Sequence, residues 1–107
     1  MSNIGKSKVA LVTGSSTGIG YETCLALARN SFVTCATMRD KKKSRDLERI
    51  ARNENLQIKI FEMDVNIDRS VYEAIEKITT EFGKIDILVN NAGYGLFGVF
   101  EDFQWMK

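Results

Sequence analysis

Four short apolar segments recur along this chain, and each of the first three is followed by a longer stretch with helical periodicity. The segments are KVALVT (residues 8–13), SFVTCATM (31–38), LQIKIFEM (56–63) and KIDILVNN (84–91). Short β-branched apolar runs are typical of strands that are buried on both faces of a parallel sheet. Alternation of such strands with helices requires crossover connections, so the pattern predicts an α/β fold.

The helices expected between these strands are marked by apolar stripes. The first spans residues 18–30, and Gly83 is expected to end the third. Ser70 and Glu73 form an S-x-x-E pattern that predicts a capping box at the start of the third helix. The residues expected to face the core are Ile19, Thr23, Ala26 and Leu27 in the first helix, Leu47, Ile50 and Ala51 in the second, and Val71, Ala74, Ile75, Ile78 and Phe82 in the third.

These elements predict a Rossmann-type doubly wound parallel sheet. Right-handed crossovers favour about four strands in the order 3-2-1-4, with the sheet incomplete at the end that strand 4 forms. In such a sheet the ligand crevice opens at the carboxyl ends of strands 1 and 4, where the winding reverses. We therefore expect a binding site where residue 13 and residue 91 come together.

The stretch VTGSSTGIG (residues 12–20) places three glycines at the junction of the first strand and the first helix. Gly14 allows the chain to leave the strand abruptly, and Gly18 keeps a side chain out of the space between backbone and ligand. Gly20 allows the helix to pack closely on the sheet. The spacing is not that of a P-loop, because Ile19 rather than lysine follows Gly18.

The start of the first helix is predicted to be an anion site. Backbone amides in the first turn lack intrahelical acceptors and lie at the positive end of the helix dipole, where a pyrophosphate can bind. The amides expected to point outward are those of Ser15, Ser16, Thr17 and Ile19. A glycine turn that binds no ligand is the alternative interpretation of the same residues.

Composition excludes several classes of function. The 107 residues carry 15 basic and 14 acidic side chains, a net charge of +1, so we expect no nucleic-acid partner. No apolar stretch approaches the ~20 residues that span a bilayer, so we expect no membrane segment and an intracellular, cytoplasmic protein. The chain has no histidine, which argues against a metal site and against Ser-His or Cys-His nucleophile pairs. Cys24 and Cys35 are expected to be buried, reduced thiols.

Two segments resemble the motifs of the short-chain dehydrogenase/reductase family. TGSSTGIG (residues 13–20) matches the family's T-G-x-x-x-G-x-G pattern, NNAG (90–93) matches its second motif, and the resemblance covers residues 8–107. It implies that the glycine loop and Asn91, Ala92 and Gly93 contact a nicotinamide dinucleotide. It also implies that Asp64 and Val65, just after the third strand, lie against the adenine. ATMRD (36–40) followed by lysines is similar to the branch that includes the estradiol 17β-dehydrogenases and retinol dehydrogenases.

The resemblance covers only the family's first half. Members continue with further strands that carry a catalytic serine and a Tyr-x-x-x-Lys pair, and no such pair occurs here. Residues 1–107 are therefore expected to be the N-terminal part of a single dinucleotide-binding domain, with no catalytic residue of their own and no activity alone. The full-length protein is expected to oxidise or reduce a small-molecule alcohol or carbonyl compound.

The cofactor expected is NADP(H) rather than NAD(H). Family members that use NAD carry an acidic residue at the end of strand 2, and we assign the equivalent position to Thr37. Two residues on, Arg39 can bind a 2′-phosphate, with Ser16 and the lysines at 41–43 nearby. Asp40 could instead supply the NAD-type carboxylate, and RDKKK could be a solvated charged loop.

The end of the chain supports two further expectations. Asn90 to Gly93 should fix the backbone beside the cofactor, and Leu96, Phe97, Val99, Phe100 and Phe103 could line a substrate pocket or pack in a core. Strand 4 would expose an apolar edge, which favours a homo-oligomer. A non-catalytic dinucleotide sensor, or a structural fragment, would share all these residues.

Overall fold

The computed structural model describes residues 7–92. Within that part of the chain, four parallel strands form one sheet in the order β3-β2-β1-β4, as predicted. Three helices and one 3-10 turn connect the strands, and this α/β doubly wound arrangement confirms the predicted fold class. The elements are β1 (Val9–Val12), α1 (Gly18–Arg29), β2 (Val33–Met38), η1 (Lys41–Ser44), α2 (Arg45–Glu54), β3 (Ile58–Glu62), α3 (Asp68–Phe82) and β4 (Ile87–Val89).

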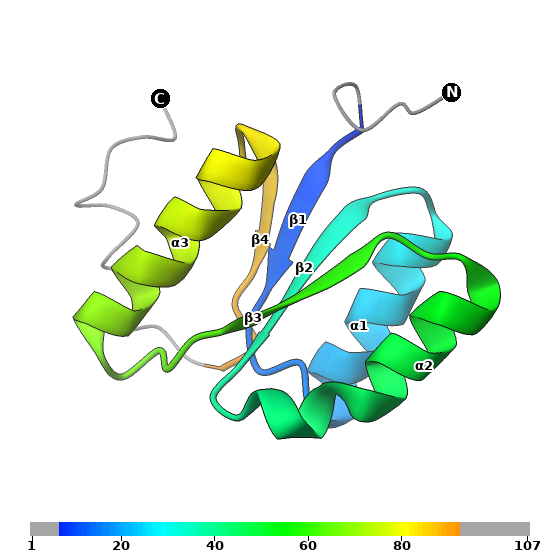
Figure 1. Ribbon diagram of the computed structural model, residues 1–107, viewed down its shortest axis with the longest axis horizontal. Coiled ribbons are helices and arrows are strands. Elements are labelled where there is room, and N and C mark those ends of the chain that lie inside the picture. Colours follow the sequence, from blue (N-terminus) through cyan, green and yellow to red (C-terminus); the bar gives the residue numbers. More distant parts are fainter. Residues whose placement is uncertain (1–6, 93–107) are drawn as a thin grey trace.

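The helices cover both faces of the sheet, with α1 and α2 on one side and α3 on the other (Figure 1). The connections that leave the carboxyl ends of β1, β2 and β3 all emerge in the lower part of that view. This arrangement follows from right-handed crossovers between parallel strands. It brings the end of β1, the end of β2 and the segment after β4 to the same edge of the sheet.

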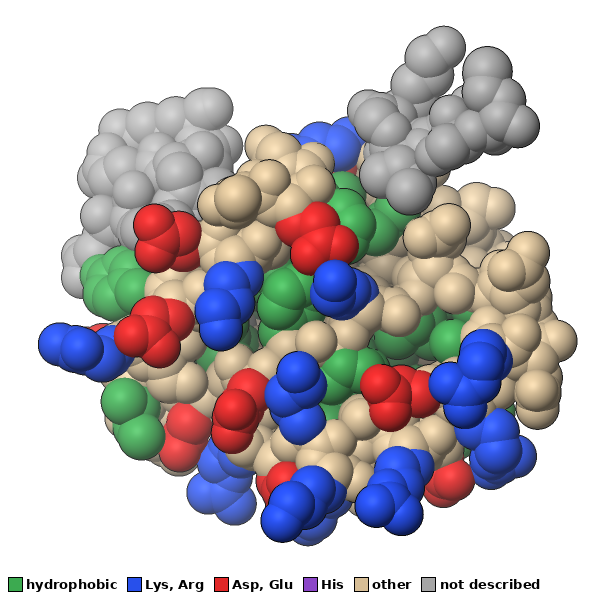
Figure 2. Space-filling view, viewed as in Figure 1, with side chains coloured by type: hydrophobic (Ala, Val, Ile, Leu, Met, Phe, Trp, Pro, Cys, Tyr) green, Lys and Arg blue, Asp and Glu red, His purple; other side chains and the backbone are tan. Residues whose placement is uncertain are grey.

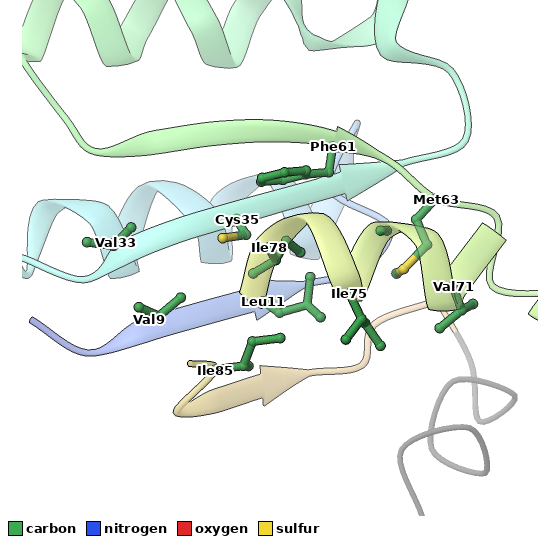
Figure 3. Close-up of a cluster of buried hydrophobic side chains, with 11 residues drawn as sticks. Val9, Leu11, Val33, Cys35, Phe61, Met63, Val71, Ile75, Ile78 and Ile85 are labelled. Atoms are coloured by element: carbon green, nitrogen blue, oxygen red, sulfur yellow. The ribbon is translucent and has the colours of Figure 1, made fainter. Parts of the chain in front are cut away.

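The side chains between α3 and the sheet form the larger of two apolar clusters. Figure 3 shows Leu11 from β1, Phe61 from β3 and Ile78 from α3 pointing toward one another. Leu11 and Ile78 are fully buried. Burial of a side chain of this size stabilises a fold by about 1.5–3 kcal/mol, so this cluster fixes α3 on the sheet. The predicted stripe of α3 is confirmed, since Val71, Ala74, Ile75 and Ile78 are buried and Phe82 packs beside them.

The strands differ in burial according to their position in the sheet. Every residue of β1 and β2 is buried, as expected for central parallel strands. Exposed residues occur along β3, and those of β4 are partly exposed, because each of these strands has one neighbour among residues 7–92. The predicted apolar edge at strand 4 is therefore present in the described part of the chain.

The predicted inward stripe of α1 is only partly correct. Ile19 is 75% exposed and Ala26 is exposed, Thr23 is partly buried, and Leu27 is partly buried and packs against the core as predicted. The residues that face the sheet are Gly20, Cys24, Leu25 and Ala28. Gly20 makes a close contact with the backbone of Gly14, just after β1, and hydropathy does not mark a glycine as a buried position. The second helix follows the prediction, with Leu47 and Ala51 buried and Ile50 packed against them.

The predicted capping box of the third helix is also wrong. Helix α3 begins at Asp68, and its N-cap is Ile67, which makes no side-chain capping hydrogen bond. Ser70 lies inside the helix, where its Oγ accepts a hydrogen bond from the Asp64 amide at 2.8 Å. The serine therefore secures the loop that precedes the helix. The end of the helix is as predicted, because Gly83 is its C-cap with a φ of +82°.

Charged side chains of both signs are interspersed over the face seen in Figure 2. This distribution agrees with the nearly balanced composition and gives no broad field of one sign on that face. None of the helices in the described residues is long and apolar enough to cross a bilayer.

A candidate dinucleotide site at the carboxyl ends of the strands

The loop from β1 to α1 turns through two glycines with left-handed backbone angles. Gly14 and Gly18 each have a φ of +62°, which side chains other than glycine rarely adopt. A Cβ at Gly14 would lie 3.2 Å from Asn91 Nδ2, whereas a Cβ at Gly18 would meet no atom within 4 Å. The roles expected for these two glycines agree with this geometry, because Gly14 makes the turn and Gly18 faces open space.

Gly20 is required for close packing at the base of the same loop. A Cβ built there would overlap the carbonyl oxygen of Gly14 and would lie 3.0 Å from Asn91 Nδ2. Helix α1 therefore packs directly on the backbone that leaves β1. The expected close approach is present, although its partner is the loop after the strand rather than the strand itself.

The first turn of α1 has backbone donors available for a ligand. An α-helix leaves its first N–H groups without intrahelical acceptors, and the N-cap residue Thr17 makes no side-chain capping hydrogen bond. Thr17 and Ile19 are exposed and Ser16 is partly exposed. These three residues lie where the sequence predicted an anion site, with the positive end of the helix dipole behind them.

The expectation that the Ser15 amide points outward is wrong. Ser15 is fully buried, and its N–H donates to the Thr37 carbonyl at 3.1 Å. Its Oγ donates to the Val12 carbonyl at 2.9 Å. Both polar groups are used inside the protein, so the outward-facing part of the loop begins at Ser16.

A groove of about 630 Å³ lies beside this loop at the carboxyl edge of the sheet. It collects residues from the glycine loop, the ends of β2 and β3, η1 and the segment after β4. Its lining residues are Gly14, Ser16, Met38, Arg39, Asp40, Lys43, Met63, Val65, Asn66 and Ala92. Five of the thirteen predicted site residues are among them: Gly14, Ser16, Arg39, Val65 and Ala92.

The end of β2 presents Arg39 to this groove. Arg39 is exposed and makes no hydrogen bond or ion pair with any residue of the described range. Lys43 lines the groove beside it, whereas Lys41 lies in another hollow. Two cations of this region can therefore reach an anion in the groove, and the guanidinium is not already paired.

The carboxylate of Asp40 has a local structural role. Its Oδ1 accepts a hydrogen bond from the Lys42 amide at 3.0 Å, and Asp40 is the N-cap of η1. This agrees with the interpretation that Asp40 belongs to the turn. It also places Lys43, whose amide donates to the Asp40 carbonyl at 3.0 Å, at the mouth of the groove.

Thr37 is not the groove-facing residue at the end of β2. It is 1% exposed, and its Oγ1 donates to the Val12 carbonyl at 3.0 Å. The residue of β2 that lines the groove is Met38. Thr37, to which we assigned the position of the NAD-type acid, therefore does not line the groove, and Met38, which does, also lacks a carboxylate.

Asp64 and Val65 follow β3 but face different hollows. Val65 lines the groove, while Asp64 lines an adjoining hollow of about 310 Å³ that also includes Arg39. The Asp64 carboxylate accepts a hydrogen bond from the Asn66 amide at 3.0 Å and thereby stabilises the turn into α3. Only Val65 of this pair is brought to the groove by the fold.

The segment after β4 is tied to the end of β1 by three contacts. The Ala92 amide donates to Thr13 Oγ1 at 2.9 Å, and Thr13 Oγ1 donates to Asn90 Oδ1 at 3.2 Å. Asn91 Nδ2 donates to the Gly14 carbonyl at 3.3 Å. The expected role of Asn90 and Asn91 in fixing backbone is confirmed by these bonds. Gly93 and the apolar residues at 96–103 lie outside the described residues.

Sequence reasoning missed four residues at this site. Met38, Met63 and Asn66 line the groove, and Thr13 anchors the segment after β4. A signal existed for the methionines, because each ends an apolar run and directly precedes a residue, Arg39 or Asp64, that was predicted to contact the cofactor. Thr13 is the first residue of the T-G-x-x-x-G-x-G pattern, which was the available signal for it, whereas Asn66 had no signal beyond its position next to Val65.

A second hollow of about 660 Å³ lies along β3 and α3, and it contains none of the predicted site residues. Its lining includes Lys59 and Glu81, whose side chains pair with each other at 3.1 Å. We assign function to the groove at the strand ends despite its slightly smaller volume. The reason is that this groove, unlike the second hollow, is lined both by residues of the glycine loop, Gly14 and Ser16, and by Arg39.

The two cysteines are buried free thiols, as expected. Burial raises the pKa of Cys24 to about 11 and that of Cys35 to about 12. Both thiols are therefore protonated at neutral pH and are poor nucleophiles. The described residues contain no group of three or more histidine, cysteine, aspartate or glutamate side chains that could hold a metal ion.

Comparison with known proteins agrees with this geometry. The family model for short chain dehydrogenases matches residues 8–107. A (+)-neomenthol dehydrogenase from Capsicum annuum is 38% identical over 105 residues, which cover 94% of this chain and 33% of that protein. The 17-beta-hydroxysteroid dehydrogenase type 1 of Mus musculus is 41% identical over 99 residues, covering 87% of this chain and 28% of that protein.

The structure of an actinorhodin polyketide ketoreductase variant with NADPH has a TM-score of 0.77 and 28% identity, covering 83% of this chain and 34% of that one. The chain thus spans about a third of the length of the relatives that it matches. Because the match includes the glycine loop, the sheet and the segment after β4, this chain belongs to the short-chain dehydrogenase family, whose members are NAD(P)-dependent oxidoreductases.

Proposed function

We propose that this chain is the cofactor-binding part of an NADP(H)-dependent short-chain oxidoreductase that interconverts a small-molecule alcohol and its carbonyl compound. The observation that carries the proposal is the guanidinium of Arg39, which has no partner among the described residues and lies in a groove that Gly14 and Ser16 of the glycine loop also line. The NADPH present in the ketoreductase structure supports it. The nicotinamide ring of such a cofactor would supply or accept the hydride.

Each part of the cofactor has residues suited to hold it. The amides of Ser16, Thr17 and Ile19 would bind the pyrophosphate, and the absence of a side chain at Gly18 leaves room for close approach. Val65 would pack on the adenine, with Asp64 behind it. Asn91, Ala92 and Gly93 would border the path to the nicotinamide.

The preference for NADP(H) follows from the charge at the end of β2. Arg39 and Lys43 would bind the 2′-phosphate, with Ser16 as a further donor. No carboxylate other than Asp40 lines the groove within the described residues, and that carboxylate already accepts a bond from the Lys42 amide. A phosphate is therefore better matched here than a pair of ribose hydroxyls.

The test compares NADPH and NADH binding in the wild type and in three variants. Loss of a charge-assisted hydrogen bond costs about 1.5–3 kcal/mol, so Arg39→Ala should weaken NADPH binding by roughly 10- to 100-fold and leave NADH binding nearly unchanged. Lys43→Ala should also weaken NADPH binding and not NADH binding, but by a smaller factor. Lys42→Ala removes an equal charge from the same turn outside the groove and should change neither affinity. Equal binding of both cofactors by the wild type would contradict the proposal.

The proposal extends to the whole protein. The Tyr-x-x-x-Lys pair is absent from these 107 residues, so we expect this chain alone not to transfer hydride, and we expect the pair in the downstream coding sequence. A downstream sequence without serine and Tyr-x-x-x-Lys would favour the alternative of a non-catalytic dinucleotide sensor. We also propose a cytoplasmic homo-oligomer. In residues 1–107 alone the apolar edge of β4 would favour self-association, and sedimentation of that form as a folded monomer would contradict this.

A further inference from the structure

Ser15 and Cys24 form a buried polar contact beneath the glycine loop that the proposed function does not use. Both residues are fully buried, and Cys24 Sγ donates to Ser15 Oγ at 3.3 Å. Cys24 lies in α1. Ser15 lies in the glycine loop, and its amide and its hydroxyl both point into the protein. The contact therefore links the helix to the loop from inside the protein.

Ser15 joins three elements of the fold through its hydroxyl and its amide. It donates to the Val12 carbonyl at the end of β1, and it accepts from the Cys24 thiol in α1. The amide of the same residue donates to the Thr37 carbonyl in β2. A hydroxyl has one donor and two acceptor sites, so the thiol satisfies an acceptor that would otherwise be buried without a partner.

This inward attachment determines where the loop turns outward. Because Ser15 is held by β1, β2 and α1, the chain is drawn inward between Gly14 and Ser16, which both line the groove. The next residues lead directly into the first turn of α1. A shift of Ser15 would therefore move the amides that the proposed function assigns to the pyrophosphate.

We propose that Ser15 and Cys24 are positioning residues for the dinucleotide phosphates, and that their hydrogen bond holds the loop amides in binding geometry. The inference rests on the proposed function, since it concerns the same phosphates. The raised pKa of Cys24 is consistent with it, because the thiol keeps the proton that it donates throughout the neutral range.

Cys35 provides a matched control for the test. It is also a fully buried free cysteine, but it lies in the cluster on the other face of the sheet, and its side chain makes no hydrogen bond with any residue between 7 and 92. Cys24→Ala and Cys35→Ala remove the same side chain from similar burial. Both should lower the free energy of unfolding, whereas only Cys24→Ala should affect cofactor binding.

The experiment measures NADPH and NADH dissociation constants and urea unfolding for the full chain. Loss of a net hydrogen bond of about 0.5–1.5 kcal/mol corresponds to roughly 2- to 10-fold weaker binding. We expect this loss for Ser15→Ala and for Cys24→Ala, for both cofactors equally, so that the preference set by Arg39 is unchanged. The double variant should lose no more than the larger single loss, since the hydrogen bond that Cys24→Ala removes is also removed by Ser15→Ala. Cys24→Ser, which keeps a donor, should recover part of the affinity.

Two outcomes would overturn this inference alone. The first is wild-type cofactor affinity in Cys24→Ala or Ser15→Ala, and the second is an equal loss of affinity in Cys35→Ala. Both leave the proposed function intact, because the wild type still binds the dinucleotide. Failure of the wild type to bind either cofactor would overturn the proposed function and this inference together.

Discussion

Alanine substitutions at Gly18 and Gly20 should separate two roles that lie within one motif. In an ordinary helix, replacement of glycine by alanine stabilises the protein by about 0.5–1 kcal/mol. At Gly20 the added Cβ would overlap the Gly14 carbonyl oxygen and lie 2.8 Å from its carbonyl carbon. Overpacking of this kind costs about 1–3 kcal/mol, so Gly20→Ala should lower the free energy of unfolding instead of raising it.

Gly18→Ala should act differently, because no atom lies within 4 Å of its added Cβ. Its φ of +62° makes alanine unfavourable by about 1–2 kcal/mol through backbone strain alone. The Cβ would also occupy the open space in which we place the pyrophosphate. We therefore expect modest destabilisation together with a large loss of NADPH affinity.

Gly83→Ala is the control for backbone strain. Gly83 has a φ of +82°, has no atom within 4 Å of its added Cβ, and caps α3 away from the groove. Urea unfolding followed by circular dichroism should show similar destabilisation for Gly18→Ala and Gly83→Ala. Cofactor titration should show weak binding only for Gly18→Ala. Wild-type NADPH affinity in Gly18→Ala would refute the argument that phosphates approach the backbone at this position.

Two further predictions concern ionisation. The Val9 amide, at 2.7 Å, and then the Lys84 ammonium hold the pKa of Asp86 below its usual range. The resulting stability is present above the unfolded pKa of about 3.9 and is lost as pH falls through the lower folded value. Asp86→Asn should therefore flatten the pH dependence of urea unfolding below about pH 4; an unchanged profile would contradict this. Because burial raises the pKa of Cys24 and Cys35, neither thiol should react with iodoacetamide at pH 8 until the protein unfolds. Mass spectrometry of the folded protein tests this, and rapid labelling of either cysteine would disprove it.

The order of the strands was predictable because it depends on features that sequence patterns record. Continuous apolar runs mark central parallel strands, and crossover handedness then restricts the topology. The orientation of α1 was not predictable in the same way. Ile19 is apolar but 75% exposed, while Gly20 makes the closest contact with the loop. Hydropathy patterns depend on apolar side chains, whereas the close contact of this helix is made by Gly20, which has no side chain.

The parts of the candidate site that depend on the backbone geometry of a motif were predictable. The parts in which hydrogen bonds to distant residues set the orientation of a group were not. The left-handed angles at Gly14 and Gly18 are what the glycine spacing requires. Ser15 occupies the same motif, yet its amide is taken by the Thr37 carbonyl. The spacing of residues within a motif does not indicate which amides will bond to a carbonyl on another strand. The motif alone therefore predicted one more free amide than the structure has.

At the end of β2, one residue both lines the groove and packs in the core, so cofactor preference and core packing depend on the same position. Successive side chains of a strand face opposite sides, so Thr37 lies on one face and Met38 on the other. Met38 lines the groove, although it is only 3% exposed and also packs in the apolar cluster beneath α1 and α2. Met38→Asp would place a carboxylate where an NAD-type acid belongs and would repel a 2′-phosphate. We expect a shift in preference toward NADH, measured as the ratio of the two dissociation constants.

The same change should reduce stability, because a buried polar group without full compensation costs about 1–3 kcal/mol on protein scales. Glu62→Asp, on the exposed end of β3, alters a carboxylate outside the groove and should change neither property. If Met38→Asp left the preference for NADPH unchanged while the protein remained folded, position 38 would not face the ribose. In that case the 2′-phosphate would have to meet Arg39 and Lys43 outside this groove.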